Sequence, residues 1–415
     1  MHTHRPVRKL APERSTASLV ESATQTTSRN YGPSPIVFDH GDGVFLVDRE
    51  GRRYLDFLAG IAVNCLGYGH PALVEALQSQ VGKLLHVSNL FYNEPQLLLQ
   101  ERLVAQSFAD RVFFCNSGAE ANEAALKLAR RYHGVVAQSG RRTIVCAQQS
   151  FHGRTLQALA ATGQPKYWEG FDPMPAGFVH VPFNDVAALE AAVDGTTCAI
   201  FLEPVQGEGG VLPATREYLA AARRLCDVSG AVLIFDEVQC GVGRLGTLWA
   251  YESFGVVPDI ATWAKGIAGG VPLGVMLSTE KLSEGFKKGS HASTFGGNPL
   301  ACRGGLTVLD IVSTPEFLAN VVAMGERLQA GLRGLAEKGG VIKEVRGMGL
   351  MVGAVVGSEL APKIMAAALE RGLLINTAGG DTLRFVPPLI VGAPDVDRAV
   401  EIIEGSIESV LSSGR

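Results

Sequence analysis

The chain has 415 residues, of which 47% are hydrophobic and 19% charged, a balance that suits a globular protein of about two packed domains. Its formal net charge is −4, and no block of like charges indicates a partner such as nucleic acid or an anionic membrane. No uninterrupted apolar run approaches the ~18 residues that a membrane span needs.

Residues 1–29 differ from the rest of the chain. They are rich in Ser and Thr, contain scattered arginines and show no apolar periodicity, which predicts a flexible tail or docking arm. Targeting to an organelle by this tail is a minor alternative, because Glu13 and Glu21 are unusual in transit peptides. An apolar segment typical of a secretory signal is missing.

The next segment, residues 41–57, has short alternating runs separated by Asp-Gly and Glu-Gly, which predicts a small hairpin unit. From about residue 95, helical patterns alternate with seven short apolar runs. These runs are residues 111–115, 143–147, 177–183, 198–204, 231–238, 259–265 and 272–278. They are mostly apolar and do not alternate cleanly, as expected for strands covered on both faces by helices, so we predict a doubly wound, mostly parallel sheet of seven strands.

After about residue 300 the pattern changes to long amphipathic helices at 314–339 and 394–411, with short strands at 349–357 and 381–389 between them. We therefore expect an α/β fold with a large domain at 86–299. A smaller α+β domain would be built from both chain ends, residues 30–85 and 300–415.

In an open parallel sheet, ligands bind beyond the carboxyl ends of the strands. Ser117, Gly118 and Ala119 follow the first run and precede a strong helix pattern, so their N–H groups and one hydroxyl could hold an anion at the helix N-terminus. Ordinary helix capping by Asn116 or Ser117 explains the same residues equally well.

Two strand ends carry carboxylates and another carries a lysine. Glu203 and Asp236 each need a cation, a metal or a hydrogen-bond donor, and no His or Cys at ligand-like spacing favours the metal. Lys265 stands immediately before glycines, where a lysine is typically a phosphate ligand or forms a Schiff base. Pyridoxal phosphate needs a lysine, a carboxylate for its ring nitrogen and an anion cup, so one cofactor accounts for Lys265, Asp236 and residues 117–119.

Gly241, Gly243 and Gly246 have the spacing of a dinucleotide-binding turn, which makes an NAD-dependent oxidoreductase the alternative from another enzyme class. Residues 237–240 separate the first glycine from the strand, and no acid is well placed for a ribose. We therefore interpret these glycines as a turn that leads the chain away from the site.

Seven cysteines are scattered along the chain without a C-x-x-C pair: Cys65, Cys115, Cys146, Cys198, Cys226, Cys240 and Cys302. This pattern predicts buried, reduced thiols and favours a cytoplasmic protein, with neither a disulfide framework nor a zinc site.

Seven motifs cover most of the chain from residue 30 onward: NSGAEANEAALKLAR, SFHGRT, EPVQGEGG, DEVQCGVGRLG, TWAKGIAGGVPLG, STFGGNPLAC and LRFVPPL. In this order they resemble the class III, fold-type I aminotransferases, and among these most closely the acetylornithine branch. The resemblance implies pyridoxal phosphate as the cofactor and small-molecule amino acids and 2-oxo acids as substrates.

The resemblance also implies a role for each cofactor-binding residue. Lys265 would form the Schiff base with the cofactor aldehyde and move the proton, and Asp236 would pair with the ring nitrogen. Gln239 would lie near the ring oxygen and Phe151 would stack on the ring. Ser117, Gly118 and Ala119 would surround the phosphate.

For the substrates, the resemblance implies that Arg154 binds a carboxylate of the amine donor and Arg384 a carboxylate of 2-oxoglutarate. In relatives that act on ω-amines, the glutamate at the position of Glu203 pairs with the arginine at the position of Arg384 when the other substrate is bound, and the resemblance implies the same pair here. Thr294 would reach the phosphate of the neighbouring subunit, so the active sites would be shared in a homodimer.

The implied reaction moves the terminal amine of N2-acetylornithine to 2-oxoglutarate, in arginine biosynthesis. Aminotransferases of ornithine, succinylornithine, succinyl-diaminopimelate or 4-aminobutyrate share almost all of these motifs and stay open as alternatives, as does an aminomutase. Phe91 stands where many relatives have a tyrosine, which leaves its effect on substrate gating open. We assign His152 no chemical role.

Overall fold

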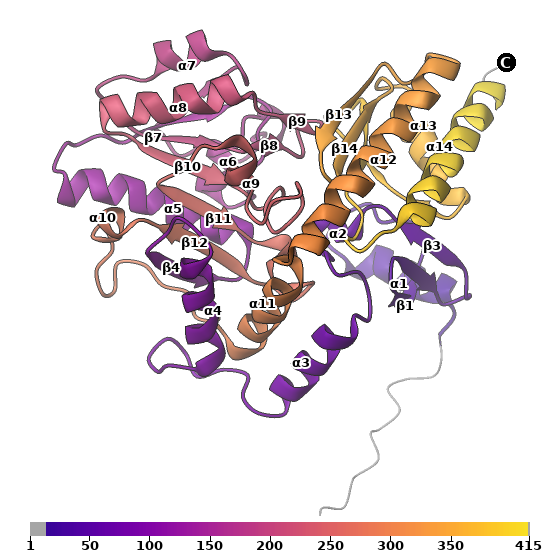
Figure 1. The fold of residues 1–415 in the computed structure, drawn as a ribbon, viewed down its shortest axis with the longest axis horizontal. Coiled ribbons are helices and arrows are strands. Elements are labelled where there is room, and N and C mark those ends of the chain that lie inside the picture. The colour runs from indigo at the N-terminus through magenta and orange to yellow at the C-terminus, as the bar shows by residue number, and fades with distance from the viewer. Residues whose placement is uncertain (1–13, 414–415) are drawn as a thin grey trace, which may run out of the picture.

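The computed structural model describes residues 14–413, and its large domain is built around one seven-stranded sheet (Figure 1). The strands are β4 (Arg111–Cys115), β5 (Thr143–Ala147), β6 (Phe178–Val181), β7 (Thr197–Leu202), β10 (Val232–Asp236), β11 (Ile260–Trp263) and β12 (Gly274–Ser278). Their order is β4–β12–β11–β10–β7–β5–β6, and only β12 runs antiparallel to its neighbours. All seven predicted runs therefore form strands, and the mostly parallel sheet is confirmed.

Helices cover both faces of this sheet. α5 (Gly118–Arg131) packs on one face, and α8 (Arg216–Ser229) packs against β7 and β10 on the other. On β10, Val232 and Ile234 join the apolar cluster of α5, whereas Leu233 and Phe235 join the cluster that contains α8. Successive side chains of a strand point to opposite faces, so a strand buried on both sides is apolar throughout.

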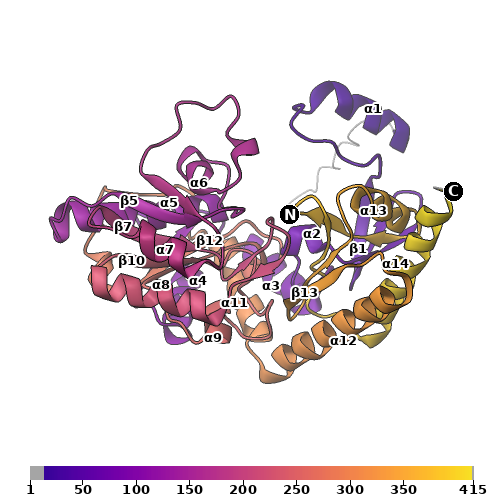
Figure 2. The same ribbon diagram turned by 90° about the horizontal axis from the view of Figure 1, so that it is seen from above.

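The remaining helices of the large domain lie around this core (Figures 1 and 2). They are α4 (Glu94–Ala105), α6 (Leu156–Ala161), α7 (Val186–Ala192), α9 (Ala250–Phe254) and α10 (Glu280–Ser283). A short hairpin of β8 (Val205–Gln206) and β9 (Leu212–Pro213) projects beyond the end of β7.

The smaller domain combines both ends of the chain in one sheet. β1 (Phe38–Asp42), β2 (Phe45–Asp48) and β3 (Arg53–Asp56) form an antiparallel unit, and β3 pairs in parallel with β15 (Leu373–Leu374). The second sheet and the helices of this domain come from the later part of the chain. They are β13 (Glu344–Met348), β14 (Met351–Val355), β16 (Asn376–Ala378), β17 (Thr382–Phe385), α12 (Pro315–Gly339), α13 (Ala361–Glu370) and α14 (Ala393–Ser413). The expected α+β domain from both chain ends is confirmed.

Four helices lie where the two domains meet: the short α2 (Ala59–Ala62), α3 (Pro71–Val81), α4 and α11 (Pro299–Val312). α11 packs on both α3 and α4. The predicted boundaries at residues 85/86 and 299/300 therefore cross one packed group of helices, and they stay a prediction.

The N-terminal segment corrects one expectation. Residues 1–29 were expected to lack regular structure, but α1 (Thr16–Thr26) is an 11-residue helix. Its start signal is Ser15, whose side chain accepts a hydrogen bond from the N–H of Ser18 at 3.2 Å. Figure 2 shows α1 standing apart from the rest of the small domain. The arginines at positions 5 and 8, and Glu13, lie outside the described residues.

The glycine-rich loop after Asp236 is not a dinucleotide-binding turn, because residues 240–246 form a series of turns and no helix begins before α9. Gly243 and Gly246 have φ angles of +82° and +91°. A Cβ atom at either position would clash with Val312 of α11 or Val322 of α12. The glycines therefore allow this loop to approach the small domain closely.

Arg244 fixes the same loop to the small domain. Its fully buried side chain donates from Nη1 to the carbonyl oxygens of Leu350 at 3.0 Å and Pro387 at 2.6 Å. In return, the N–H of Leu350 donates to the carbonyl oxygen of Arg244 at 3.0 Å. Burial lowers the pKa of the Arg244 guanidinium to about 10.

All seven cysteines lie buried with free thiols. Across residues 14–413 no three or more His, Cys, Asp or Glu side chains group in a way that could hold a metal ion. No single described helix is long and apolar enough to cross a membrane, although α11 and α12 together, bent by 74°, meet that test of length and composition.

Candidate active site

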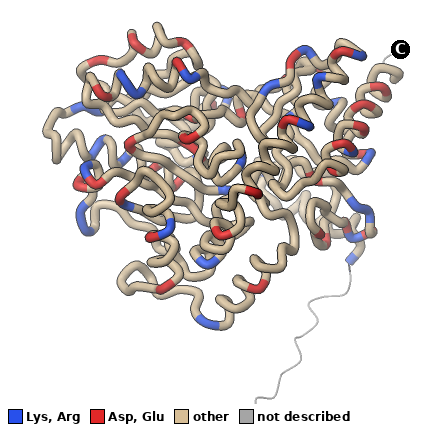
Figure 3. Tube along the Cα trace, in the orientation of Figure 1, with Lys and Arg blue, Asp and Glu red and all other residues tan. Residues whose placement is uncertain are grey.

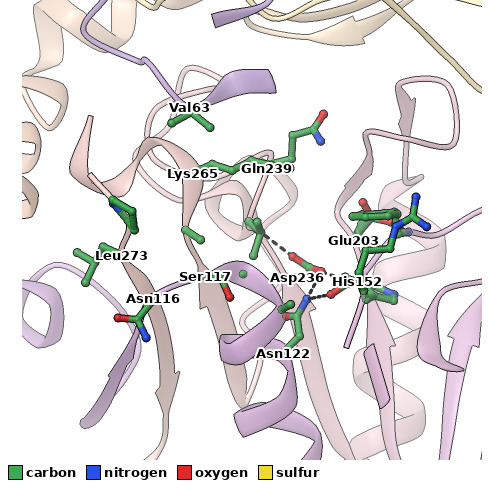
Figure 4. A pocket seen from close by; sticks show the side chains of 18 of the residues that line it. Val63, Asn116, Ser117, Asn122, His152, Glu203, Asp236, Gln239, Lys265 and Leu273 are labelled. Atoms are coloured by element: carbon green, nitrogen blue, oxygen red, sulfur yellow. Dashed lines mark hydrogen bonds and ion pairs between the residues drawn. The ribbon is translucent and has the colours of Figure 1, made fainter. Parts of the chain in front are cut away.

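A cavity of about 440 Å³ opens at the carboxyl edge of the seven-stranded sheet (Figure 4). Different strands deliver its lining, because the chain reaches the cavity each time a parallel strand ends. Nine of the eleven residues proposed from the sequence line it: Ser117, Gly118, Ala119, Phe151, Arg154, Glu203, Asp236, Gln239 and Lys265. Arg384 and Thr294 are not among the lining residues.

Asp236 ends β10 at the floor of this cavity with its carboxylate almost fully buried. Oδ2 accepts hydrogen bonds from Asn122 Nδ2 at 2.7 Å and is 2.8 Å from His152 Nδ1, and Oδ1 accepts from the N–H of Val238 at 3.0 Å. These three contacts hold the carboxylate in one orientation.

Asn122 and His152 are functional residues that sequence reasoning missed. Thr262 on β11 donates to Asn122 Oδ1 at 2.6 Å, so the Asn122 amide can only direct its NH₂ group toward Asp236. The His152 ring is stacked on Phe201 with centroids 3.9 Å apart, which fixes its plane. The sequence did contain a signal for Asn122. It lies four residues after Gly118, a predicted site residue, and residues four apart share one face of a helix such as α5.

Lys265 follows β11 and lies across the cavity from the end of β10. Its backbone has φ +47°, in the left-handed region that a residue with a side chain rarely adopts. Burial lowers the pKa of its ammonium group, while the carboxylates of Glu208 and Asp236 oppose this effect. A lysine with a lowered pKa supplies the neutral amine that a nucleophile or general base requires.

The N-terminus of α5 forms one wall of the cavity. Ser117 is its N-cap and accepts the N–H of Glu120 at 3.2 Å, and Gly118 and Ala119 begin the helix. The first N–H groups of an α-helix have no partner inside the helix, so they and the helix dipole favour an anion at this wall. A Cβ atom at Gly118 would clash with the side chain of Val238, so only glycine fits there.

Glu203, at the end of β7, is buried beside Phe151. Its carboxylate accepts the N–H of Phe151 at 2.9 Å and that of Gly207 at 3.4 Å. Burial, and then the negative charge of Asp236, raise the pKa of Glu203 well above its ordinary value. Glu203 thus holds the backbone of the loop that presents the Phe151 ring to the cavity.

The structure corrects the predicted pair of Glu203 and Arg384. Arg384 on β17 is fully buried, and its Nη1 donates to Glu208 Oε1 at 2.6 Å and to Gln239 Oε1 at 3.1 Å. Burial raises the pKa of Glu208, but the Arg384 guanidinium outweighs this and lowers it. The β8–β9 hairpin carries Glu208 toward β17, whereas Glu203 stays at the end of β7.

Arg384 also has an unused donor. Its Nε donates to Asn376 Oδ1 at 3.0 Å, but Nη2 is buried and has no hydrogen-bond partner within residues 14–413. A buried guanidinium with an unsatisfied donor next to the cavity is suited to bind a carboxylate of a ligand.

The remaining two residues lie at the rim. Arg154 is exposed, and its guanidinium lies 4.0 Å from the centre of the Tyr167 ring and 5.6 Å from that of Phe151. Thr294 is exposed next to Ser293, whose Oγ accepts from Asn116 Nδ2 at 3.2 Å. Thr294 thus stands close to its own cavity without lining it, and its predicted contact with a neighbouring subunit stays a prediction.

These groups fit pyridoxal phosphate. An amine at Lys265, a buried carboxylate at Asp236 and the N-terminus of α5 meet at one cavity of about 440 Å³. They offer a nucleophile for an aldehyde, an anion for a protonated ring nitrogen and an anion-binding wall for a phosphate.

Comparison with known proteins gives one consistent result. The family model "Aminotransferase class-III" matches residues 26–407. An acetylornithine aminotransferase of Neisseria meningitidis serogroup A is 50% identical over 389 residues, which are 93% of this chain and 98% of that protein. The crystal structure of N-acetylornithine aminotransferase from Stenotrophomonas maltophilia is similar at a TM-score of 0.82 and 39% identity, covering 94% of this chain and 99% of that one.

Ornithine aminotransferase from Toxoplasma gondii is also similar in structure. It superimposes at a TM-score of 0.93 with 31% identity over 97% of both chains. The backbone is therefore shared by proteins named for different amine donors, whereas the sequence is nearer to those named for acetylornithine.

Proposed function

This chain belongs to the class-III aminotransferases, and on that premise we propose that it transfers the terminal amine of N2-acetylornithine to 2-oxoglutarate with pyridoxal phosphate as cofactor. The products are N-acetylglutamate 5-semialdehyde and glutamate, and the reaction belongs to arginine biosynthesis. The observation that carries the chemistry is the meeting of Lys265, Asp236 and the α5 N-terminus at one cavity. The 50% identity to an acetylornithine aminotransferase over nearly the whole chain supports the substrate.

When bound, pyridoxal phosphate supplies an aldehyde that exchanges amines and a ring that delocalises electrons. Asp236 would hold a proton at the ring nitrogen, because Asn122 and His152 fix the orientation of its carboxylate at the cavity floor. Lys265 would remove the proton from the substrate carbon that bears the amine and deliver it to the aldehyde carbon of the cofactor, since burial favours the neutral form of the Lys265 amine.

Substrate recognition uses two arginines. Arg154 presents an exposed fork at the rim, held by Tyr167 and suited to the α-carboxylate of the amine donor. Arg384 binds a carboxylate of 2-oxoglutarate once Glu208 moves away from it, and it is neutralised by Glu208 when the monocarboxylate donor is present. One cavity thereby serves two substrates of different charge.

The substrate assignment is tested by comparing kcat/KM for N2-acetylornithine, ornithine and 4-aminobutyrate with 2-oxoglutarate as acceptor. We expect acetylornithine to give the highest value and the two half-reactions to show ping-pong kinetics. A preference for ornithine over its acetylated form would refute the assignment while leaving the aminotransferase chemistry intact.

We also propose a homodimer with shared active sites. The segment 84–92 exposes Leu90, Phe91 and Tyr92, which are 85%, 70% and 87% accessible, and Asn89 ties it to the loop of Thr294 through the carbonyl oxygen of Ser293 at 3.0 Å. Large exposed apolar side chains gathered in one place favour an interface. Light scattering of the purified protein tests this, since a monomer that is active at micromolar concentration would exclude shared sites. We place the protein in the cytoplasm, on the support of its free thiols.

A further inference from the structure

A second cavity, of about 420 Å³, lies on the large domain at the C-terminal end of α5 and shares no lining residue with the active-site cavity. Four cationic side chains line it, together with the polar Gln157 and Ser290: Lys127, Arg130, Arg131 and Arg142. Its lining includes no carboxylate. Figure 3 shows Lys and Arg segments at the edge of the large domain where α5 ends in Figure 1.

The four cations of this cavity form no ion pair within the described part of the chain. The Nε atom of Arg131 is buried and lacks a hydrogen-bond partner in the described part of the chain. Like charges held together at a partly desolvated site repel one another unless an anion joins them.

Arg130 is held rigidly by neutral groups. Its guanidinium donates to the carbonyl oxygens of Arg142 at 3.2 Å and Ala176 at 3.0 Å and to Gln157 Oε1 at 2.9 Å, and it lies 4.8 Å from the centre of the Phe178 ring. Burial lowers the pKa of Arg130, and the charge of Arg142 acts in the same direction.

Glu123 lies near this group and its charge opposes the lowering of the Arg130 pKa by burial, but it forms no ion pair with any of the four cations in the described structure. Glu123 Oε1 accepts from Thr155 Oγ1 at 2.7 Å and from the N–H of Gln157 at 3.1 Å. Lys127 meets a neutral partner instead, since its Nζ lies 2.8 Å from His291 Nδ1, and burial and the charge of Lys127 lower the pKa of His291.

Complementing the helix dipole explains only part of the cluster. Arg130 and Arg131 stand in the last turn of α5, where a cation is favourable by about 0.3–1 kcal/mol. This effect does not account for Arg142, which comes from the segment before β5, or for the open cavity that the four side chains line together.

We propose that this cavity binds a small anion that carries a pyrophosphate group. Guanidinium forks match phosphate oxygens in pairs, and four cations balance a ligand of about three to four negative charges. A volume of about 420 Å³ exceeds the space that one phosphate fills. The site is separate from the cofactor phosphate, which we assign to the opposite end of α5.

The test titrates the cofactor-saturated enzyme with sodium pyrophosphate in a calorimeter at constant ionic strength, with inorganic phosphate, citrate and ADP as parallel ligands. We expect pyrophosphate to bind at least tenfold more tightly than phosphate or citrate, without a change in the visible absorption of the bound cofactor. If ADP binds as tightly as pyrophosphate, the natural ligand is a nucleotide that carries the pyrophosphate group. If ADP binds more weakly, the natural ligand is free pyrophosphate. Both outcomes support the site.

The double variant Arg131→Gln/Arg142→Gln removes two charges whose side chains donate no hydrogen bond in the described structure. We expect it to lose at least tenfold in pyrophosphate affinity. The control Lys343→Gln/Lys363→Gln removes two exposed charges from the small domain and should bind like the natural protein. If the double variant fails to fold, Arg142→Gln alone is tested in the same way.

Thermal unfolding gives an independent readout. Pyrophosphate should raise the unfolding midpoint of the natural protein and of the control, and Arg142→Gln should have a higher midpoint than the natural protein in low salt without ligand. Absence of binding, equal affinity in the natural and double-variant proteins, or citrate binding as tightly as pyrophosphate would overturn the proposal.

Discussion

The contact between His152 and Asp236 allows a demanding test of the active site. Replacing His152 by Phe keeps an aromatic ring stacked on Phe201 but removes the N–H that lies 2.8 Å from Asp236 Oδ2. Asp236 then keeps two of its three donors, the amide of Asn122 and the N–H of Val238.

The size of the effect follows from the type of bond. A hydrogen bond to a charged group is worth about 1.5–3 kcal/mol, and 1.4 kcal/mol is a factor of ten. If this whole free energy is lost from the interaction between Asp236 and the ring nitrogen, kcat falls by about tenfold to a hundredfold. The KM values for both substrates should change little, because His152 forms no hydrogen bond with Arg154 or Arg384 in the described structure.

The assay is steady-state kinetics with both substrates, combined with absorbance of the bound cofactor from pH 6 to pH 10. His180→Phe is the matched control, since the His180 ring contacts the carbonyl oxygen of Ala161 at 3.0 Å and forms no hydrogen bond with Asp236 in the described structure. A His152→Phe enzyme that folds normally and keeps kcat within twofold of the natural enzyme would refute the reasoning.

Three further predictions concern buried charges. Lys265→Ala should lose at least about a thousandfold in turnover and bind the cofactor without the visible band of the natural enzyme, while its unfolding midpoint is not lowered, because a buried amine is removed. Glu208→Gln should lower KM for 2-oxoglutarate several-fold and raise it for acetylornithine, because Arg384 loses its negative partner; unchanged values for both substrates would contradict the alternation. Burial raises the pKa of Glu237 to about 7, above its unfolded value, so the folded state binds more protons and stability should fall by about 3 kcal/mol as pH rises from 4.5 to 7. Denaturant titrations at pH 5 and pH 8 check this, and Glu237→Gln should reduce the difference between the two pH values by about 3 kcal/mol.

The sheet and the centre of the site could be predicted because each rests on a local signal. A strand buried on both faces must be apolar, and a lysine or carboxylate that ends such a strand is conspicuous. Lys265 and Asp236 were found in this way, and the structure brings both to one cavity. The confirmed family and fold follow from motifs that keep their order along the chain.

Other features depend on distances that a sequence does not contain. Glu203 and Glu208 occur in one motif, and only the path of the β8–β9 hairpin decides which of them meets Arg384. His152 follows Phe151 directly, yet its role depends on the neighbouring strand end that carries Asp236. The α1 helix was missed because its apolar face is short and its start is marked by Ser15 alone.

The glycine loop and Arg244 limit how this enzyme can be recombined with its relatives. Gly243 and Gly246 leave no room for side chains against α11 and α12, and within the described residues the Arg244 guanidinium finds its acceptors only in carbonyl groups of the small domain, through Nη1. A chimera that joins this large domain to another small domain would leave a guanidinium buried without acceptors unless those backbone positions coincide. Substrate range is therefore better altered by exchanging residues at the cavity rim than by exchanging whole domains.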